Sequence, residues 1–141
     1  MNKKRFITLG MFFLSFVIIF TLLHTYSMAL TPKKHIERIE KFGWKTDFYY
    51  PRKQEFVIPT HSDSRHTYQL ADVTFHGLEK GTLEQYNYRL KGNCGNHHLE
   101  AVLLTYKENI IDSFIQLSES DPGIVKMMDQ PVFMEQICQR K

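Results

Sequence analysis

The most reactive side chains of the sequence lie together between residues 94 and 98, where Cys94 is followed by His97 and His98. A histidine can take the proton of a thiol, so this cluster could form a nucleophile. Thiolate and imidazole also bind zinc, which normally needs four such ligands. Because the sequence has no complementary Cys-x-x-Cys or His-x-x-x-His element, a hairpin loop with a bridged cysteine and solvated histidines is the favoured interpretation.

A second group of residues that could bind metal, His61, Asp63 and His66, lies in a polar stretch. Residues of these types are common in turns, where they bond to the nearby backbone. Turn formation and solubility therefore explain this group, and no metal site is predicted.

Two pairs of carboxylates, Glu37 with Glu40 and Glu79 with Glu84, are close enough in sequence to be considered for acid–base catalysis. Such catalysis needs environments that separate the two pKa values, and neither pair has the apolar setting that would do so. The sequence thus predicts no catalytic residue and no cofactor, and it favours a protein that is not an enzyme.

Aromatic residues gather before Pro51, at Trp44, Phe48, Tyr49 and Tyr50. Aromatic side chains bury a large area at low entropic cost, so these four could line a groove for a peptide or a glycan. Packing between a helix and a sheet would use the same residues, and it explains Trp44 best. The four residues are the candidate binding patch of the sequence.

The first 30 residues carry the pattern of a targeting segment. Lys3-Lys4-Arg5 directly precedes Phe6–Leu23, a run of 18 residues without a charge. A spanning helix needs roughly 17–25 apolar residues, and basic flanks stay in the cytoplasm. We therefore expect residues 6–23 to enter a membrane and the C-terminal part of the chain to lie outside.

Two fates of this segment remain open. Ser27-Met28-Ala29 offers the small residues that a signal peptidase reads, which favours cleavage after Ala29. The apolar run is longer than the roughly 7–15 residues of a signal peptide, which favours a retained anchor. The protein is expected either at the cell membrane with its C-terminal domain outside or secreted.

The net charge of +3 also depends on this segment. Residues 1–29 hold three of the 18 Lys and Arg residues and none of the 15 Asp and Glu residues, so the rest of the chain is formally neutral. Nucleic-acid binding requires basic groups that neutralise phosphates. A nucleic-acid partner is therefore not expected.

Both cysteines, Cys94 and Cys138, lie beyond the targeting segment. Disulfides persist in oxidising compartments, so one bridge between the two is the simplest prediction. Two free thiols or a catalytic Cys94 are the alternatives.

The elements that would position these residues can be traced along the chain. Thr31-Pro32 resembles a helix start, and apolar residues then recur every three positions at Ile36, Ile39 and Phe42 before a glycine, which predicts a helix over 32–42. Residues 44–50 and 54–59 favour short extended pieces.

The middle of the chain is harder to assign. Residues 60–66 are polar and indicate a loop. Residues 66–77 fit either a strand with a bulge or a short helix. The sequence as a whole identifies no small-molecule ligand.

The clearest pattern begins at Thr82. One face of a predicted half-buried strand carries Tyr86, Tyr88 and Leu90, and the other carries Gln85, Asn87, Arg89 and Lys91. Residues 99–106 are apolar on both faces, which indicates a central strand, and 110–117 supply the next one after a tight connection. Short connections between consecutive strands predict an antiparallel meander.

Beyond the meander the sequence favours helices. Ser120-Asp121-Pro122 is typical of a helix start and precedes the apolar residues of 124–128. Pro131 is expected to interrupt this helix, and 132–138 to add a second short one.

Several blocks together resemble a family of small exported Gram-positive proteins catalogued as domain of unknown function 4830. The blocks are Ile36–Trp44, Phe56–Pro59, Tyr86–Leu90, Glu100–Tyr106 and Ile110-Ile111. Residues 60–80 do not carry the family's middle segment, and the tail from Ser120 is extra. The resemblance implies export but no activity and no catalytic residues.

Together these patterns predict residues 1–30 as a signal peptide or N-terminal transmembrane anchor and 31–141 as a single α+β domain. An N-terminal helix is expected to pack on an antiparallel β-meander, followed by a short helical tail. The favoured function is a non-catalytic envelope interaction or regulatory module with an envelope protein as partner. The alternative is a small secreted enzyme or metal-binding protein that uses the Cys94, His97 and His98 loop.

Overall fold

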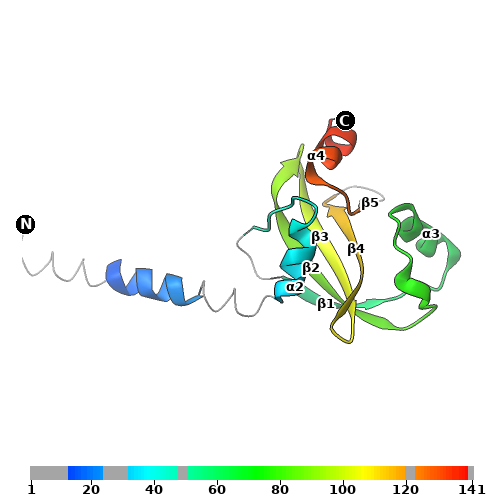
Figure 1. Ribbon diagram of the computed structural model, residues 1–141, viewed down its shortest axis with the longest axis horizontal. Helices are drawn as coiled ribbons and strands as arrows, with labels where there is room; N and C mark the ends of the chain where they lie inside the picture. Colours follow the sequence, from blue (N-terminus) through cyan, green and yellow to red (C-terminus); the bar gives the residue numbers. More distant parts are fainter. Residues whose placement is uncertain (1–12, 24–31, 48–50, 120–122, 140–141) are drawn as a thin grey trace, which may run out of the picture. The chain divides into compact units, whose positions relative to one another are not determined.

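The computed structural model describes residues 13–23, 32–47, 51–119 and 123–139 (Figure 1). The chain divides into two units, Met1–Pro32 and Lys33–Lys141. In the first unit residues 13–23 are helical, and all of them are exposed. Among the described helices, none is both long and apolar enough to span a membrane. The rest of the predicted segment 6–23, its basic flank and the Ser27-Met28-Ala29 motif lie outside the described residues.

The second unit is built on one antiparallel sheet of five strands in the order β1-β2-β3-β4-β5. The strands are β1 (Arg52–Val57), β2 (Thr82–Cys94), β3 (His97–Tyr106), β4 (Asn109–Leu117) and β5 (Ile124–Lys126). The predicted meander is confirmed, with one further strand at each edge. Lys107 and Glu108 both have positive φ, which is the backbone twist of a tight hairpin turn between β3 and β4.

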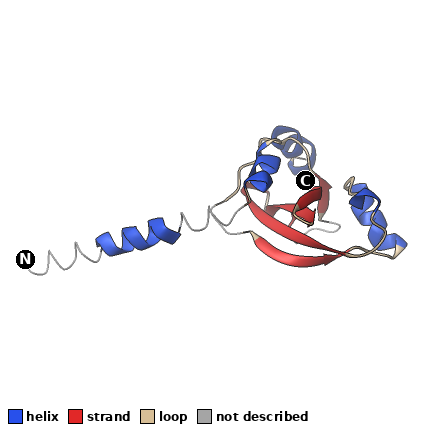
Figure 2. Ribbon diagram, turned by 60° about the horizontal axis from the view of Figure 1, so that its bottom comes forward, coloured by secondary structure: helices blue, strands red, loops and turns tan. Residues whose placement is uncertain are grey.

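One face of the sheet, here called the α2 face, is covered by the helices near the ends of this unit. They are α2 (Lys33–Glu40), α4 (Gln130–Phe133) and the π-helical turn η2 (Met134–Cys138) (Figures 1 and 2). Ile39 from α2 and Phe133 from α4 are fully buried against Leu99, Leu103 and Ile115 of the sheet. The predicted N-terminal helix and helical tail are confirmed.

The opposite face, here called the α3 face, is covered by α3 (Ser62–Leu70) and the short 3-10 helix η1 (Phe75–Gly77). The loop predicted for residues 60–66 is therefore wrong. The sequence of α3 lacks the apolar stripe by which a surface helix is recognised. In agreement with this, none of its residues is fully buried. The half-buried Tyr68 attaches α3, because its ring contacts the rings of Phe56, Phe75 and Phe114 at 5.4–5.8 Å.

The predicted helix from residue 120 is also wrong. Ile124–Lys126 forms β5 and pairs with Phe114–Gln116 of β4, while residues 120–122 lie outside the described part. Two β-branched residues, Ile124 and Val125, suit an edge strand better than a helix. Pro131 lies in the first turn of α4, so it begins the terminal helix rather than interrupting one.

Candidate binding site

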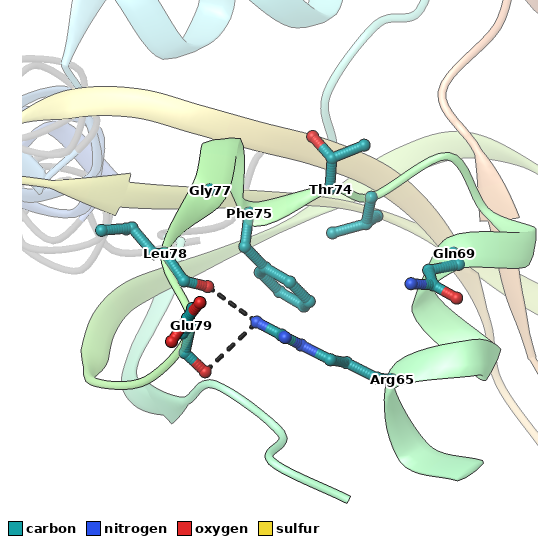
Figure 3. Close-up of a pocket in the computed structure, with 8 residues that line it drawn as sticks. Arg65, Gln69, Thr74, Phe75, Gly77, Leu78 and Glu79 are labelled. Carbon is teal, nitrogen blue, oxygen red and sulfur yellow. Dashed lines mark hydrogen bonds between the residues drawn. The ribbon is translucent and has the colours of Figure 1, made fainter. Parts of the chain in front are cut away.

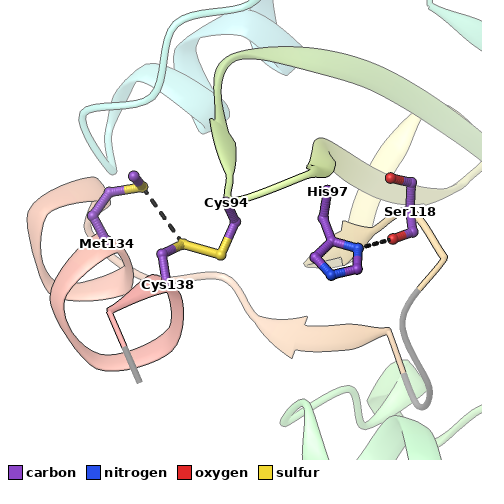
Figure 4. The surroundings of a disulfide bond; sticks show 5 residues. All are labelled: Cys94, His97, Ser118, Met134 and Cys138. Carbon is purple, nitrogen blue, oxygen red and sulfur yellow. Dashed lines mark hydrogen bonds between the residues drawn. A yellow bond between two sulfur atoms is a disulfide. The ribbon is translucent and has the colours of Figure 1, made fainter. Parts of the chain in front are cut away.

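The two cysteines form a disulfide bond (Figure 4). Cys94 at the end of β2 and Cys138 at the end of η2 are 44 residues apart in sequence, and their Cα atoms are 5.0 Å apart. The predicted bridge is confirmed. A bonded sulfur is not a thiolate, so Cys94 provides neither a nucleophile nor a zinc ligand in this state.

The two histidines of the same hairpin contact neighbouring segments. His97 donates a hydrogen bond from Nδ1 to the backbone carbonyl of Ser118 (Figure 4). His98 accepts one from Arg89 at 2.6 Å, and its backbone N–H donates to Ser118 Oγ at 2.8 Å. These contacts hold the β2–β3 hairpin against the segment that follows β4.

The second group of possible metal ligands lies on the surface. His61, Asp63 and His66 are exposed at α3. Among the residues that the structure describes, no three His, Cys, Asp or Glu side chains are grouped so that they could hold a metal ion.

Trp44 belongs to the core of the α2 face. It is 0% exposed, its Nε1 donates to the carbonyl of Met128 at 2.9 Å, and its ring meets Phe133 edge-on at 5.3 Å. This agrees with the packing interpretation of Trp44. The other three residues of the candidate patch, Phe48, Tyr49 and Tyr50, lie outside the described residues.

A small cavity of about 260 Å³ lies between α3 and η1 (Figure 3). Arg65 extends from α3 across it, donating from Nη2 to the carbonyls of Leu78 and Glu79 at 2.8 and 3.2 Å. The guanidinium also lies over the ring of Phe75 at 6.0 Å. Arg65 thus ties the η1 segment to α3, and this hollow is part of the packing of the two helices.

A larger cavity of about 340 Å³ lies on the α3 face, and it is here called the sheet cavity. Its polar lining comes mainly from strand residues whose side chains alternate onto this face: Arg52, Gln54, Gln85, Asn87 and Gln116. Its apolar lining consists of Phe56, Val57, Tyr68, Phe114 and Ile124. Three strands and α3 therefore bring four side-chain amides and three aromatic rings beside the same hollow.

A chain of hydrogen bonds fixes the polar side of the sheet cavity. Gln85 Nε2 donates to Asn87 Oδ1 at 2.7 Å, and Asn87 Nδ2 donates to Glu100 Oε2 at 2.8 Å. Arg52 Nη2 donates to the same carboxylate oxygen at 3.3 Å. Because the guanidinium offsets the carboxylate, the chain is held in place without net charge.

The burial of β2 differs from its alternating sequence. Gln85 and Asn87 are only 6% and 4% exposed, although the alternation of polar and apolar residues predicts a half-buried strand with both amides in water. That prediction is wrong for these two amides, because side chains from β1, β4 and α3 surround them on this face. The sequence alone does not indicate that these amides are buried. The register of the sheet is needed as well, because it places Gln54 beside Gln85 and Arg52 beside Asn87.

A buried pair of titratable groups lies on the α2 face. His35 is 2% exposed, and its Nδ1 is hydrogen bonded to the hydroxyl of Tyr88 at 2.7 Å. Burial and, to a smaller extent, the charge of Lys34 lower the pKa of His35 to about 4, against an opposing effect of Glu84. Burial, with a smaller effect of Tyr86, raises the pKa of Tyr88. The two groups are therefore neutral near pH 7 and join α2 to β2.

No protein-family model, curated protein or solved structure matches the chain. The resemblance to domain of unknown function 4830 stays a prediction. What the structure itself defines is a disulfide-bonded α+β domain with a polar, amide-lined cavity on one face of its sheet.

Proposed function

We propose that the protein is a non-catalytic interaction module, held at or released from the outer face of the membrane, that binds its envelope partner through the sheet cavity. The observation that carries this proposal is the pair of buried amides Gln85 and Asn87, which line that cavity and are held in a hydrogen-bonded chain with the half-buried Glu100. Binding sites typically combine apolar surface with a few fixed polar groups that converge on the ligand. The sheet cavity has this combination.

The chemistry of the cavity favours an uncharged partner surface. Side-chain amides offer both donors and acceptors, and Gln54, Gln85 and Gln116 come from three different strands. Tyr68 and Phe114 add aromatic area. Amide or hydroxyl groups of a partner suit this lining better than a phosphate or a carboxylate would, because Arg52 is already paired with Glu100.

An extracytoplasmic location is supported by two features. The Cys94–Cys138 bridge is of the type that persists in oxidising compartments. The helical residues 13–23 expose nine large apolar side chains, and the hydroxyl of Thr21 donates to the carbonyls of Val17 and Ile18 within the same helix. A helix whose polar group is satisfied internally suits an apolar surrounding.

The alternative is a small secreted enzyme or metal-binding protein that uses Cys94, His97 and His98. It would require reduction of the bridge, since Cys94 is bonded to Cys138. His97 and His98 are already hydrogen bonded to Ser118 and Arg89. The geometry therefore favours the binding module.

Co-purification from the membrane fraction in mild detergent tests the proposal. The full chain should capture a specific envelope partner, and the double variant Gln54→Ala/Gln116→Ala should lose it while keeping its fold. Gln136→Ala is the matched control, because this glutamine is exposed on η2, away from the cavity lining. Capture that is unchanged in the double variant would rule out the sheet cavity as the binding site.

A further inference from the structure

Among the described strands, β1 lies at an edge of the sheet, and its hydrogen bonds to β2 follow a defined pattern. The N–H of Ile58 donates to the carbonyl of Gly81 at 2.9 Å, and this pair continues the register in which Gln54 lies opposite Gln85. Hydrogen-bonded pairs alternate along antiparallel strands. The even-numbered residues of β1 therefore bond to β2, and the N–H and C=O groups of Lys53, Glu55 and Val57 point to the open edge.

Within the described residues, no strand pairs with β1 on that side. An edge of this kind can accept another strand. The side chains of its outward-bonding residues alternate in charge, Lys53 followed by Glu55, and Val57 after them is 71% exposed. The edge is thus polar at one end and apolar at the other.

We propose that β1 pairs with β1 of a second copy of this chain, antiparallel and centred on Gln54, to form a continuous ten-stranded sheet. In this register Lys53 lies opposite Glu55 of the second copy, and Glu55 lies opposite its Lys53. Both pairs consist of residues whose backbone groups face the open edge, so the backbone hydrogen bonds and the opposite charges are satisfied together.

The neighbouring registers fail one of two requirements: opposite charges must face each other, and the backbone groups of both strands must point to the open edge. A shift of two residues in one direction places Lys53 opposite Lys53, and in the other direction it places Glu55 opposite Glu55. Like charges directly opposite each other destabilise a strand pair. A shift of one residue would place outward-facing groups opposite groups that already bond to β2.

The contacts around β1 are compatible with this pairing. Lys53 forms an ion pair with Glu84 at 2.8 Å and lies over the ring of Tyr86 at 5.5 Å, so its ammonium is held on the α2 face, where Glu55 of the second copy would meet it. On the α3 face Arg52 would lie opposite Phe56 of the second copy. The exposed Val57 would be covered by Pro51, where the missing N–H ends the ladder.

Cysteine cross-linking of the full chain in mild detergent tests the register. In the proposed dimer the two Gln54 residues form a non-hydrogen-bonded pair with Cα atoms roughly 4.5 Å apart, a distance that a disulfide can bridge. Gln54→Cys should therefore give a covalent dimer under mild oxidation. Gln116→Cys is the matched control, because this exposed glutamine lies on β4 in the interior of the sheet, and it should stay monomeric on non-reducing gels.

Charge reversal distinguishes dimerisation through β1 from association through the apolar residues 6–23. Lys53→Glu and Glu55→Lys each convert both ion pairs into like-charge pairs, so each should weaken the dimer by about tenfold or more in sedimentation equilibrium. The double variant Lys53→Glu/Glu55→Lys should restore it. A chain that stays monomeric at all concentrations, a dimer that ignores both reversals, or equal cross-linking of the Gln54→Cys and Gln116→Cys variants would overturn the proposal.

Discussion

Asn87 lies at the centre of the hydrogen-bonded chain on the α3 face, between Gln85 and Glu100. A buried polar group that loses its partner costs about 1–3 kcal/mol. Asn87→Ala removes the partner of both neighbours, so the free energy of unfolding in urea should fall by an amount in that range. Gln116→Ala, on the same face but exposed, should stay within about 0.5 kcal/mol. Equal effects of the two variants would show that the chain does not stabilise the fold.

His35 makes the stability depend on pH. Its pKa is lowered to about 4 by burial and by Lys34, against the influence of Glu84, whereas an unfolded histidine titrates near pH 6.5. The unfolded chain therefore binds an extra proton between these values. The contribution of neutral His35 is fully present above about pH 6.5 and is lost as the pH falls through about 4, by roughly 3 kcal/mol in total.

Urea denaturation at pH 7, 5.5 and 4 measures this effect. Wild type should lose more stability on acidification than the His35→Leu variant does. The carboxylates titrate in both proteins, whereas His35 titrates only in wild type. The variant should also be less stable at pH 7, since the Tyr88 hydroxyl loses its partner. Parallel pH dependences would contradict the assignment of His35 as a neutral, buried group.

At the scale of secondary-structure elements, the disulfide joins the end of β2 to the C-terminal helix. A bridge that closes a loop of this length is worth about 4 kcal/mol in the chain-entropy model, and removal from a small domain typically costs about 2–5 kcal/mol. Cys94→Ser and Cys138→Ser should therefore lose similar stability, whereas His98→Ala should change it by about 0.5 kcal/mol or less, because this side chain is exposed.

Alkylation under non-reducing, denaturing conditions checks the bridge directly. No labelled thiol is expected before reduction, and two per chain are expected after it. Two labelled thiols before reduction would contradict the bridge. They would make Cys94 available again beside His97 and His98.

The elements that the sequence predicts well are those whose pattern is local. Residues 99–106 are apolar on both faces and form the central strand β3, and the periodic Ile36 and Ile39 mark α2. The helix α3 escapes prediction because it depends on Tyr68, whose three ring partners come from β1, η1 and β4. The pattern of residues 124–128 indicates a helix, whereas 124–126 form strand β5, because this strand depends on pairing with β4.

The candidate site could not be predicted for the same reason. Gln54, Gln85 and Gln116 are more than thirty positions apart along the chain, and only the register of the sheet and the cover of α3 bring them to one cavity. The disulfide, by contrast, needed no register, since Cys94 and Cys138 are the two cysteines of the sequence.

At the scale of the whole molecule, the proposed topology places Lys33–Lys141 outside the membrane. A reporter that is active only outside the cytoplasm, fused after Lys141, should be active, and a reporter that works only in the cytoplasm should be silent. The physical reason is Lys3-Lys4-Arg5 before the uncharged run 6–23. The reverse pattern would place the domain, and its partner, in the cytoplasm.

Photo-cross-linking in intact cells tests the proposed binding through the sheet cavity most directly. A photoreactive amino acid in place of Gln116, which lines the cavity, should give a discrete adduct with an envelope component. The same amino acid in place of Gln136, exposed on η2, should give none. An adduct from position 136 alone, or none from either position, would contradict binding at the sheet cavity.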